Sequence, residues 1–168
     1  MKWFRNNIEI KESIVDYLEN LFDDILNKNH KFKVSIGTDS QKISPFKYKF
    51  ATVILITTYE ELGGINVGRG GMMIYATYNH EFKASDKEII NERMVFEVSK
   101  SIEVAYQLST LLDLYEVKLE IHADINPNPM FESNKALQQS VGYILGMGYN
   151  FKIKPDAIAS SSCADKII

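Results

Sequence analysis

The sequence predicts an α/β fold with a mixed five-stranded sheet flanked by helices. Three segments rich in β-branched and aromatic residues follow one another through short polar or glycine-rich connections, which indicates hairpin-linked antiparallel strands. The rest of the chain alternates helix and strand character, a pattern typical of βαβ units with parallel strands. The length of 168 residues suits one domain with one hydrophobic core.

The chain is predicted to begin with an amphipathic helix. Residues 10–27 place apolar side chains at helical spacing along one face. We therefore interpret residues 1–30 as an N-terminal helical extension and residues 31–168 as the core of the single domain.

Three strands forming a meander are predicted next, over residues 32–37, 48–58 and 72–79. The glycines between the second and third strands predict a turn and a β-bulge. One part of this stretch, GRGG at residues 68–71, lacks the spacing and the terminal Lys-Ser/Thr of a phosphate-binding P-loop. We interpret it as part of a bulged hairpin.

A long helix is predicted from Ser85 to about Leu114, with Ser85 and Glu88 forming a capping box. The remaining elements are, in order, a strand over residues 116–123, a helix over 133–147, a strand over 149–154 and a short helix near Ser161. The prolines at 127 and 129 remove amide donors and stop the fourth strand.

Composition limits the classes of function. No run approaches the roughly 20 apolar residues of a membrane span, and the start of the chain lacks the features of a signal peptide, so we expect a cytoplasmic protein without membrane contact. A single cysteine, Cys163, excludes an internal disulfide and a cysteine-based zinc site. The net charge of −3 gives no basic patch, so a role with nucleic acid must depend on a local site.

Two aspartates follow strands of the predicted sheet. Asp39 ends the first strand and Asp124 ends the fourth. If these strands are parallel neighbours, the two carboxylates lie side by side and repel, and a hard divalent cation such as Mg²⁺ would relieve the repulsion. The alternative is structural, because an aspartate after a strand commonly caps a turn or a helix, and Asp124 alone fits an Asx turn.

Two further acids are candidates. Glu97 borders the predicted buried stripe of the long helix, and Glu92 is its rival on a different side of that helix. The stripe consists of Met94, Val98, Ile102, Ala105 and Leu108. Asp165 lies in the last turn of the sequence, where the residues alone favour a solvated position on a frayed terminus.

Four segments together resemble the acidic motifs of the ribonuclease H-like superfamily. They are IGTDSQ, RMVFEVSKSIEVAYQL, IHADIN and SSSCADKII, and they occur in the order of the superfamily's elements. The resemblance covers residues 30–168, with the helix at 10–27 as an addition. Within the superfamily, the chain from SNKALQQ to SSSCADK looks like a small bacterial family of predicted ribonuclease H-like nucleases.

The resemblance implies a ribonuclease H-like fold and a set of catalytic metal ligands. By position these are Asp39 from the first strand, Glu97 from the long helix, Asp124 from the end of the fourth strand and Asp165 from the start of the final helix. Glu92 remains an alternative to Glu97, and Asp156 remains an alternative to Asp165. Two Mg²⁺ or Mn²⁺ ions about 4 Å apart would then support phosphodiester hydrolysis, with Asp39 bridging them.

The implied substrate is nucleic acid, either RNA, DNA or a hybrid. Ser40, Gln41 and His122 are the candidate substrate contacts beside the acids, although His122 also fits a half-buried structural residue. Lys154 and Lys166 are the nearest candidates for phosphate contact. The alternative function is a non-catalytic ribonuclease H-like module that binds nucleic acid or a protein partner.

Overall fold

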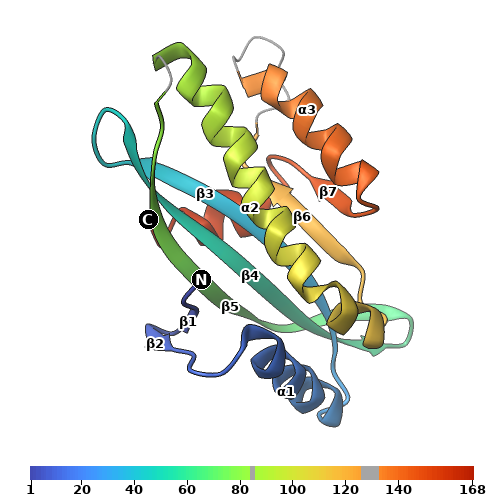
Figure 1. Ribbon diagram of the computed structural model, residues 1–168. Helices are drawn as coiled ribbons and strands as arrows, with labels where there is room; N and C mark the ends of the chain where they lie inside the picture. Colours follow the sequence, from blue (N-terminus) through green and yellow to red (C-terminus); the bar gives the residue numbers. More distant parts are fainter. Residues whose placement is uncertain (84–85, 126–132) are drawn as a thin grey trace.

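The computed structural model describes residues 1–83, 86–125 and 133–168, with the backbone alone for 86–88 and 133–139. The described residues form a mixed seven-stranded sheet in the order β2-β1-β5-β4-β3-β6-β7 (Figure 1). The strands are β1 (Phe4–Arg5), β2 (Ile8–Glu9), β3 (Lys31–Lys42), β4 (Lys47–Leu62), β5 (Ile65–Glu81), β6 (Leu119–Ala123) and β7 (Asn150–Lys152). The helices are α1 (Ile14–Asn27), α2 (Asp86–Leu114), α3 (Ser133–Gly146) and the short π-helix η1 (Ala159–Ala164).

The predicted fold class is confirmed. Strands β3, β4 and β5 form the expected antiparallel meander, and β6 and β7 join it in parallel through helical connections. The strand count of five is too low, because β1 and β2 add a short hairpin to the β5 edge. Each of these strands has only two residues, which is too short for a hydrophobic period to appear in the sequence.

The central strands are longer than predicted. Strand β3 continues through Lys42, and every residue from Lys31 onward pairs with β4. The prediction of a strand over residues 32–37 that ends at Asp39 is therefore wrong about its end, since Asp39 pairs with Ala51 inside the antiparallel ladder. Its polar residues remain in extended conformation because the ladder bonds use backbone groups, whatever the side chain.

The predicted turn and bulge between β4 and β5 are confirmed. Gly63 and Gly64 form a two-residue hairpin turn with φ of 59° and 82°, values that glycine adopts without strain. The bulge lies farther along, where the pairing shifts between Thr58 and Tyr59. Arg69 is the extra residue on the opposite strand, so GRGG lies within β5.

Helix α1 begins at Ile14, four residues later than predicted. Ser13 is its N-cap, and the Ser13 hydroxyl accepts a hydrogen bond from the Asp16 amide at 3.1 Å. The buried face of the helix packs beside β3, where the rings of Phe22 and Phe32 stack with centroids 4.4 Å apart.

Helices α2 and α3 lie side by side across one face of the sheet (Figure 1). All five residues of the predicted α2 stripe are buried, which confirms the helical period. The stripe packs on the aliphatic side chains of β3, β4 and β5, including Ile36, Ile54 and Ile74. The predicted cap at Ser85 and the prolines at 127 and 129 lie outside the described residues.

The opposite face of the sheet carries η1. Side chains alternate between faces along a strand, and Thr38 contacts α2 whereas its neighbour Gly37 abuts η1. The backbone of η1 lies so close that a Cβ atom at Gly37 would be 2.4 Å from the Ser160 nitrogen. No helix in the described ranges has the length and apolar character needed to cross a membrane.

Replacing Gly37 by alanine should destabilise the fold, because the added methyl group would meet backbone atoms of Ser160 and Ala159 that cannot rotate away. We expect urea denaturation to show a loss of about 2 kcal/mol in the free energy of unfolding, as for other overpacked sites. Gly71→Ala is the matched control, because the nearest atoms to its Cβ lie 3.8 and 4.0 Å away. Equal stability of the two variants would contradict this account of how η1 docks.

Candidate functional site

Asp39 and Asp124 occupy equivalent positions on two neighbouring parallel strands. The β3–β6 ladder ends with Thr38 opposite Ala123, and each aspartate directly follows one member of that pair. Strand β6 stops there, whereas β3 continues with β4 alone. The structure therefore places both carboxylates at the edge where β3 extends beyond its parallel neighbour, as expected from the sequence.

Glu97 approaches the same edge from α2. The residue is only 5% exposed, and its Oε1 accepts a hydrogen bond of 2.6 Å from the Ser40 hydroxyl. Arg93, one turn earlier on α2, has its Nε 3.6 Å from the same oxygen. Glu92 is exposed and lines a separate hollow of about 480 Å³ with residues such as His80 and Phe96. Of the two rival glutamates, Glu97 is the one that the structure brings to Asp39 and Ser40.

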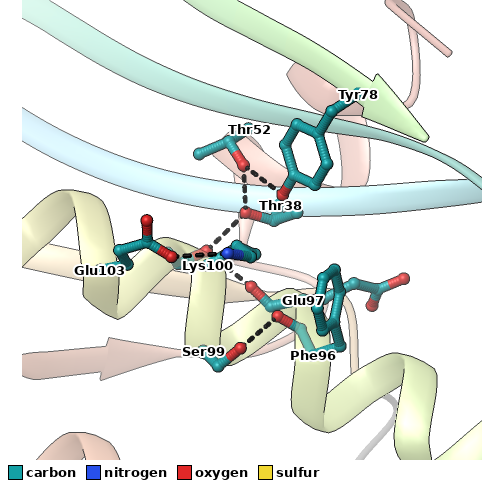
Figure 2. A network of polar contacts seen from close by, with 9 residues as sticks. Thr38, Thr52, Tyr78, Phe96, Glu97, Ser99, Lys100 and Glu103 are labelled. Carbon is teal, nitrogen blue, oxygen red and sulfur yellow. Dashed lines mark hydrogen bonds and ion pairs between the residues drawn. The ribbon is translucent and has the colours of Figure 1, made fainter. Parts of the chain in front are cut away.

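A buried polar network holds α2 against the sheet beside these acids. The Thr38 hydroxyl lies 2.9 Å from the hydroxyls of both Thr52 on β4 and Ser101 on α2. Thr52 in turn lies 3.1 Å from the Tyr78 hydroxyl on β5, and Figure 2 shows these side chains converging above α2. Ser101 also donates to the Glu97 carbonyl oxygen at 3.2 Å. The network fixes the turn of α2 that carries Glu97.

This network was not predicted from the sequence. Thr38 and Thr52 have the β-branched character of ordinary strand residues, and Ser101 is a single polar residue within an apolar stripe. The sequence did contain a signal for it, namely polar residues on or beside the buried faces of three elements. Buried hydroxyls need hydrogen-bond partners, so such residues indicate a polar network.

Asp165 reaches the site from the other face of the sheet. It directly follows η1 and is exposed, so it does not begin a helix as the resemblance implied. The segment after η1 is attached to the sheet, because Lys49 Nζ donates to the Ile167 carbonyl oxygen at 3.1 Å. Asp165 is close enough for its charge to raise the pKa of Asp39, whereas the charge of Asp156 acts on His122.

The predicted substrate contacts differ in their accessibility. Gln41 is exposed, whereas Ser40 is buried and donates its hydroxyl hydrogen to Glu97. His122 is 4% exposed, its Nδ1 accepts the Ala159 N–H at 3.0 Å, and its Nε2 lies 3.4 Å from Glu120. Burial lowers the pKa of His122, which favours the neutral ring that this acceptor role requires. In this arrangement His122 attaches η1 to β6.

Burial and mutual repulsion raise the pKa values of two of the acids. The pKa of Asp39 rises to about 6, mainly through burial, and the negative charges of Asp124 and Asp165 add to the effect. The pKa of Glu97 rises to about 8, again mainly through burial, with contributions from Asp39 and Asp124. The positive charge of Arg93 opposes both shifts. The acids therefore form one electrostatically coupled cluster.

Asp124 has a cationic neighbour of its own. Its Oδ1 lies 2.7 Å from Lys154 Nζ, an ion pair whose angles fall outside hydrogen-bond geometry. Lys154 follows β7 and was a candidate phosphate contact. The pair shows that the acid cluster is partly neutralised by the protein itself.

The donor set fits a hard divalent cation in its chemistry. Carboxylate oxygens are the preferred ligands of Mg²⁺ and Mn²⁺. The pKa values of Asp39 and Glu97 are raised mainly by burial and further by neighbouring acids, and the cations Arg93 and Lys154 offset only part of the negative charge. The positions of these side chains, however, do not form a complete metal site. Within the ranges described, no three Asp, Glu, His or Cys side chains stand close enough together to hold a metal ion. Side-chain movement would be needed to close the site.

A family model described as Ribonuclease H-like matches residues 13–168 of the chain. The match includes α1, which the resemblance treated as an addition to the superfamily core, and it includes the four acids Asp39, Glu97, Asp124 and Asp165. No curated protein and no solved structure matches the chain significantly.

The stability of the metal-free protein should fall as pH rises. Glu97 has a pKa of about 8 in the folded protein against 4.5 ordinarily, so between these values the folded state binds more protons than the unfolded state. Stability is therefore lost across this window as pH increases, and Asp39 acts in the same direction at its lower end. We expect the melting temperature in EDTA to decrease by several degrees from pH 5 to pH 8.

The variant Glu97→Gln should remove most of this decrease, because glutamine does not ionise. Glu92→Gln is the control, since Glu92 is exposed and its variant should retain the wild-type profile. A wild-type melting temperature that increases over this range would contradict the buried, proton-binding state of Glu97.

Proposed function

Because the chain belongs to the ribonuclease H-like family, we propose that it is a metal-dependent nuclease that hydrolyses phosphodiester bonds by a two-metal mechanism. Family membership itself points to a nuclease-type or nucleic-acid-binding function. The observation that carries the finer proposal is the cluster of Asp39, Glu97 and Asp124, in which burial and like charge raise the pKa of Asp39 to about 6 and that of Glu97 to about 8.

In the proposal, Asp39, Glu97, Asp124 and Asp165 are the residues that would hold two Mg²⁺ or Mn²⁺ ions. Bound divalent cations supply an activated water and stabilise the leaving oxygen of a phosphodiester. The chain's own contribution is to fix the ligands. Ser40 orients Glu97 through its hydroxyl, the Ser40 N–H donates to Asp39 Oδ1 at 2.8 Å, and η1 places Asp165 on the opposite side.

The proposed substrate is RNA, DNA or a hybrid of the two. With a net charge of −3, little affinity can come from the protein's overall field, so binding would depend on cations held at the acid cluster and on local contacts. Gln41, exposed at the end of β3, is the accessible member of the three candidate contact residues.

A second candidate function is a non-catalytic module that binds nucleic acid or a protein partner. Two observations favour it: the described acids do not form a closed metal site, and Lys154 already pairs with Asp124. Such a module would retain the fold while binding no divalent cation.

Mn²⁺ binding distinguishes the two functions. Titration calorimetry at pH 8, where the pKa of about 6 leaves Asp39 ionised, should show saturable Mn²⁺ binding to the wild type. Asp39→Asn should weaken it by about tenfold or more, as loss of a ligand does, and should reduce cleavage of at least one of RNA, DNA or hybrid below detection. Asp156→Asn is the matched control, because it removes an exposed carboxylate whose charge acts on His122.

Absence of Mn²⁺ binding at millimolar concentration would reject the nuclease and favour the binding module. Cleavage that survives in Asp39→Asn at the wild-type rate would place the active centre elsewhere.

The two glutamates provide a test of the ligand set. Glu97→Gln should weaken Mn²⁺ binding by about tenfold, because a neutral amide is a poorer ligand for a hard cation. Glu92→Gln should leave the dissociation constant within roughly a factor of two, since Glu92 is exposed beside a separate hollow. The reverse result would assign the helix ligand to Glu92.

A further inference from the structure

Lys154 is the cation in contact with the acid cluster on its β7 side. Its Nζ lies 2.7 Å from Asp124 Oδ1, and its side chain is 47% exposed against 20% for Asp124. An ammonium group at this distance occupies space on the carboxylate where another cation would otherwise coordinate. Since half of the lysine side chain faces water, it can leave the carboxylate at little cost in packing.

Arg93, the cation beside Glu97, is held more firmly than Lys154. Arg93 lies 3.6 Å from Glu97 Oε1, and its guanidinium carbon is 5.7 Å from the centre of the Tyr48 ring, a position that restrains it. Asp39 and Glu97 also receive hydrogen bonds from Ser40, so their oxygens are already oriented by the protein. Asp124 is oriented by Lys154, which makes this lysine the movable part of the cluster.

We propose that Lys154 is the built-in counter-ion of Asp124, and that it must release this carboxylate before a divalent cation can bind there. The inference rests on the proposed function and assigns a positioning residue to the same site. In the absence of metal, the ammonium group offsets the charge of Asp124 and lowers the repulsion among the acids. When a divalent cation enters, the positive charge of Lys154 opposes it, so Lys154 limits the affinity for the metal.

Lys152 and Lys154 allow the effect of the Lys154–Asp124 contact to be separated from the effect of removing one positive charge. Lys152, two residues earlier, is similarly exposed and pairs with Glu120 at 3.2 Å. Lys154→Met and Lys152→Met therefore change the net charge equally, but only the first removes a cation from a member of the cluster. Lys154→Arg keeps the positive charge and serves as the rescue variant.

The experiment is Mn²⁺ titration calorimetry on the wild type and these three variants, with circular dichroism to verify folding. Lys154→Met should bind Mn²⁺ about threefold to fivefold more tightly than Lys152→Met, because a partly exposed ion pair contributes up to roughly a factor of five. Lys154→Arg should stay within about a factor of two of the wild type.

The outcomes distinguish failure of this inference from failure of the proposed function. Wild-type binding together with the expected tighter binding by Lys154→Met supports the counter-ion role. Wild-type binding with an unchanged or weaker affinity in Lys154→Met overturns that role and leaves the nuclease proposal standing. Equal gains in Lys154→Met and Lys152→Met would show a general charge effect and also overturn it. No binding by any of the four proteins would overturn both, since there would be no cation for Lys154 to oppose.

Discussion

Four consecutive residues of β3, Gly37 to Ser40, connect the sheet to α2 on one face and to η1 on the other. They can do so because side chains alternate between the two faces along a strand. Gly37 lets η1 approach on one face, and Thr38 bonds to Ser101 of α2 on the other. Asp39 follows on the η1 side, and Ser40 reaches Glu97 on the α2 side. A shift of one residue in the β3 register would exchange the two faces and separate all these contacts.

The same arrangement concentrates negative charge where the sheet is most crowded. Asp39 is 9% exposed and Glu97 is buried, so both lose much of the hydration that stabilises a carboxylate. Hydrogen bonds from Ser40 and the cations Arg93 and Lys154 offset part of this cost, while the raised pKa values show that part remains. Because keeping these carboxylates charged is costly without a cation, binding of a cation would have a large effect on the stability of the folded protein.

Fold and chemistry contribute separately to the functional conclusion. The family match fixes the fold, and many proteins retain a fold after its chemistry has changed. The acids supply the chemical argument, because they come from β3, α2, the end of β6 and the segment after η1, and the charge of Asp124 helps to raise the pKa of both Asp39 and Glu97. Their present spacing and the Lys154 pair describe a site that is oriented but not closed.

The sequence by itself determined the fold class, the meander, the α2 stripe and the places of the acids along the chain, because these depend on local hydrophobic period and turn residues. It could not determine the two-residue strands β1 and β2, which carry no period, or the extent of β3, which depends on pairing with β4. Nor could it show that Glu97 and not Glu92 meets Ser40, since two positions on one helix are distinguished only by what packs against them. The Thr38 network, the approach of η1 to Gly37 and the Lys154–Asp124 pair likewise join residues far apart in sequence, so only the tertiary structure decided them.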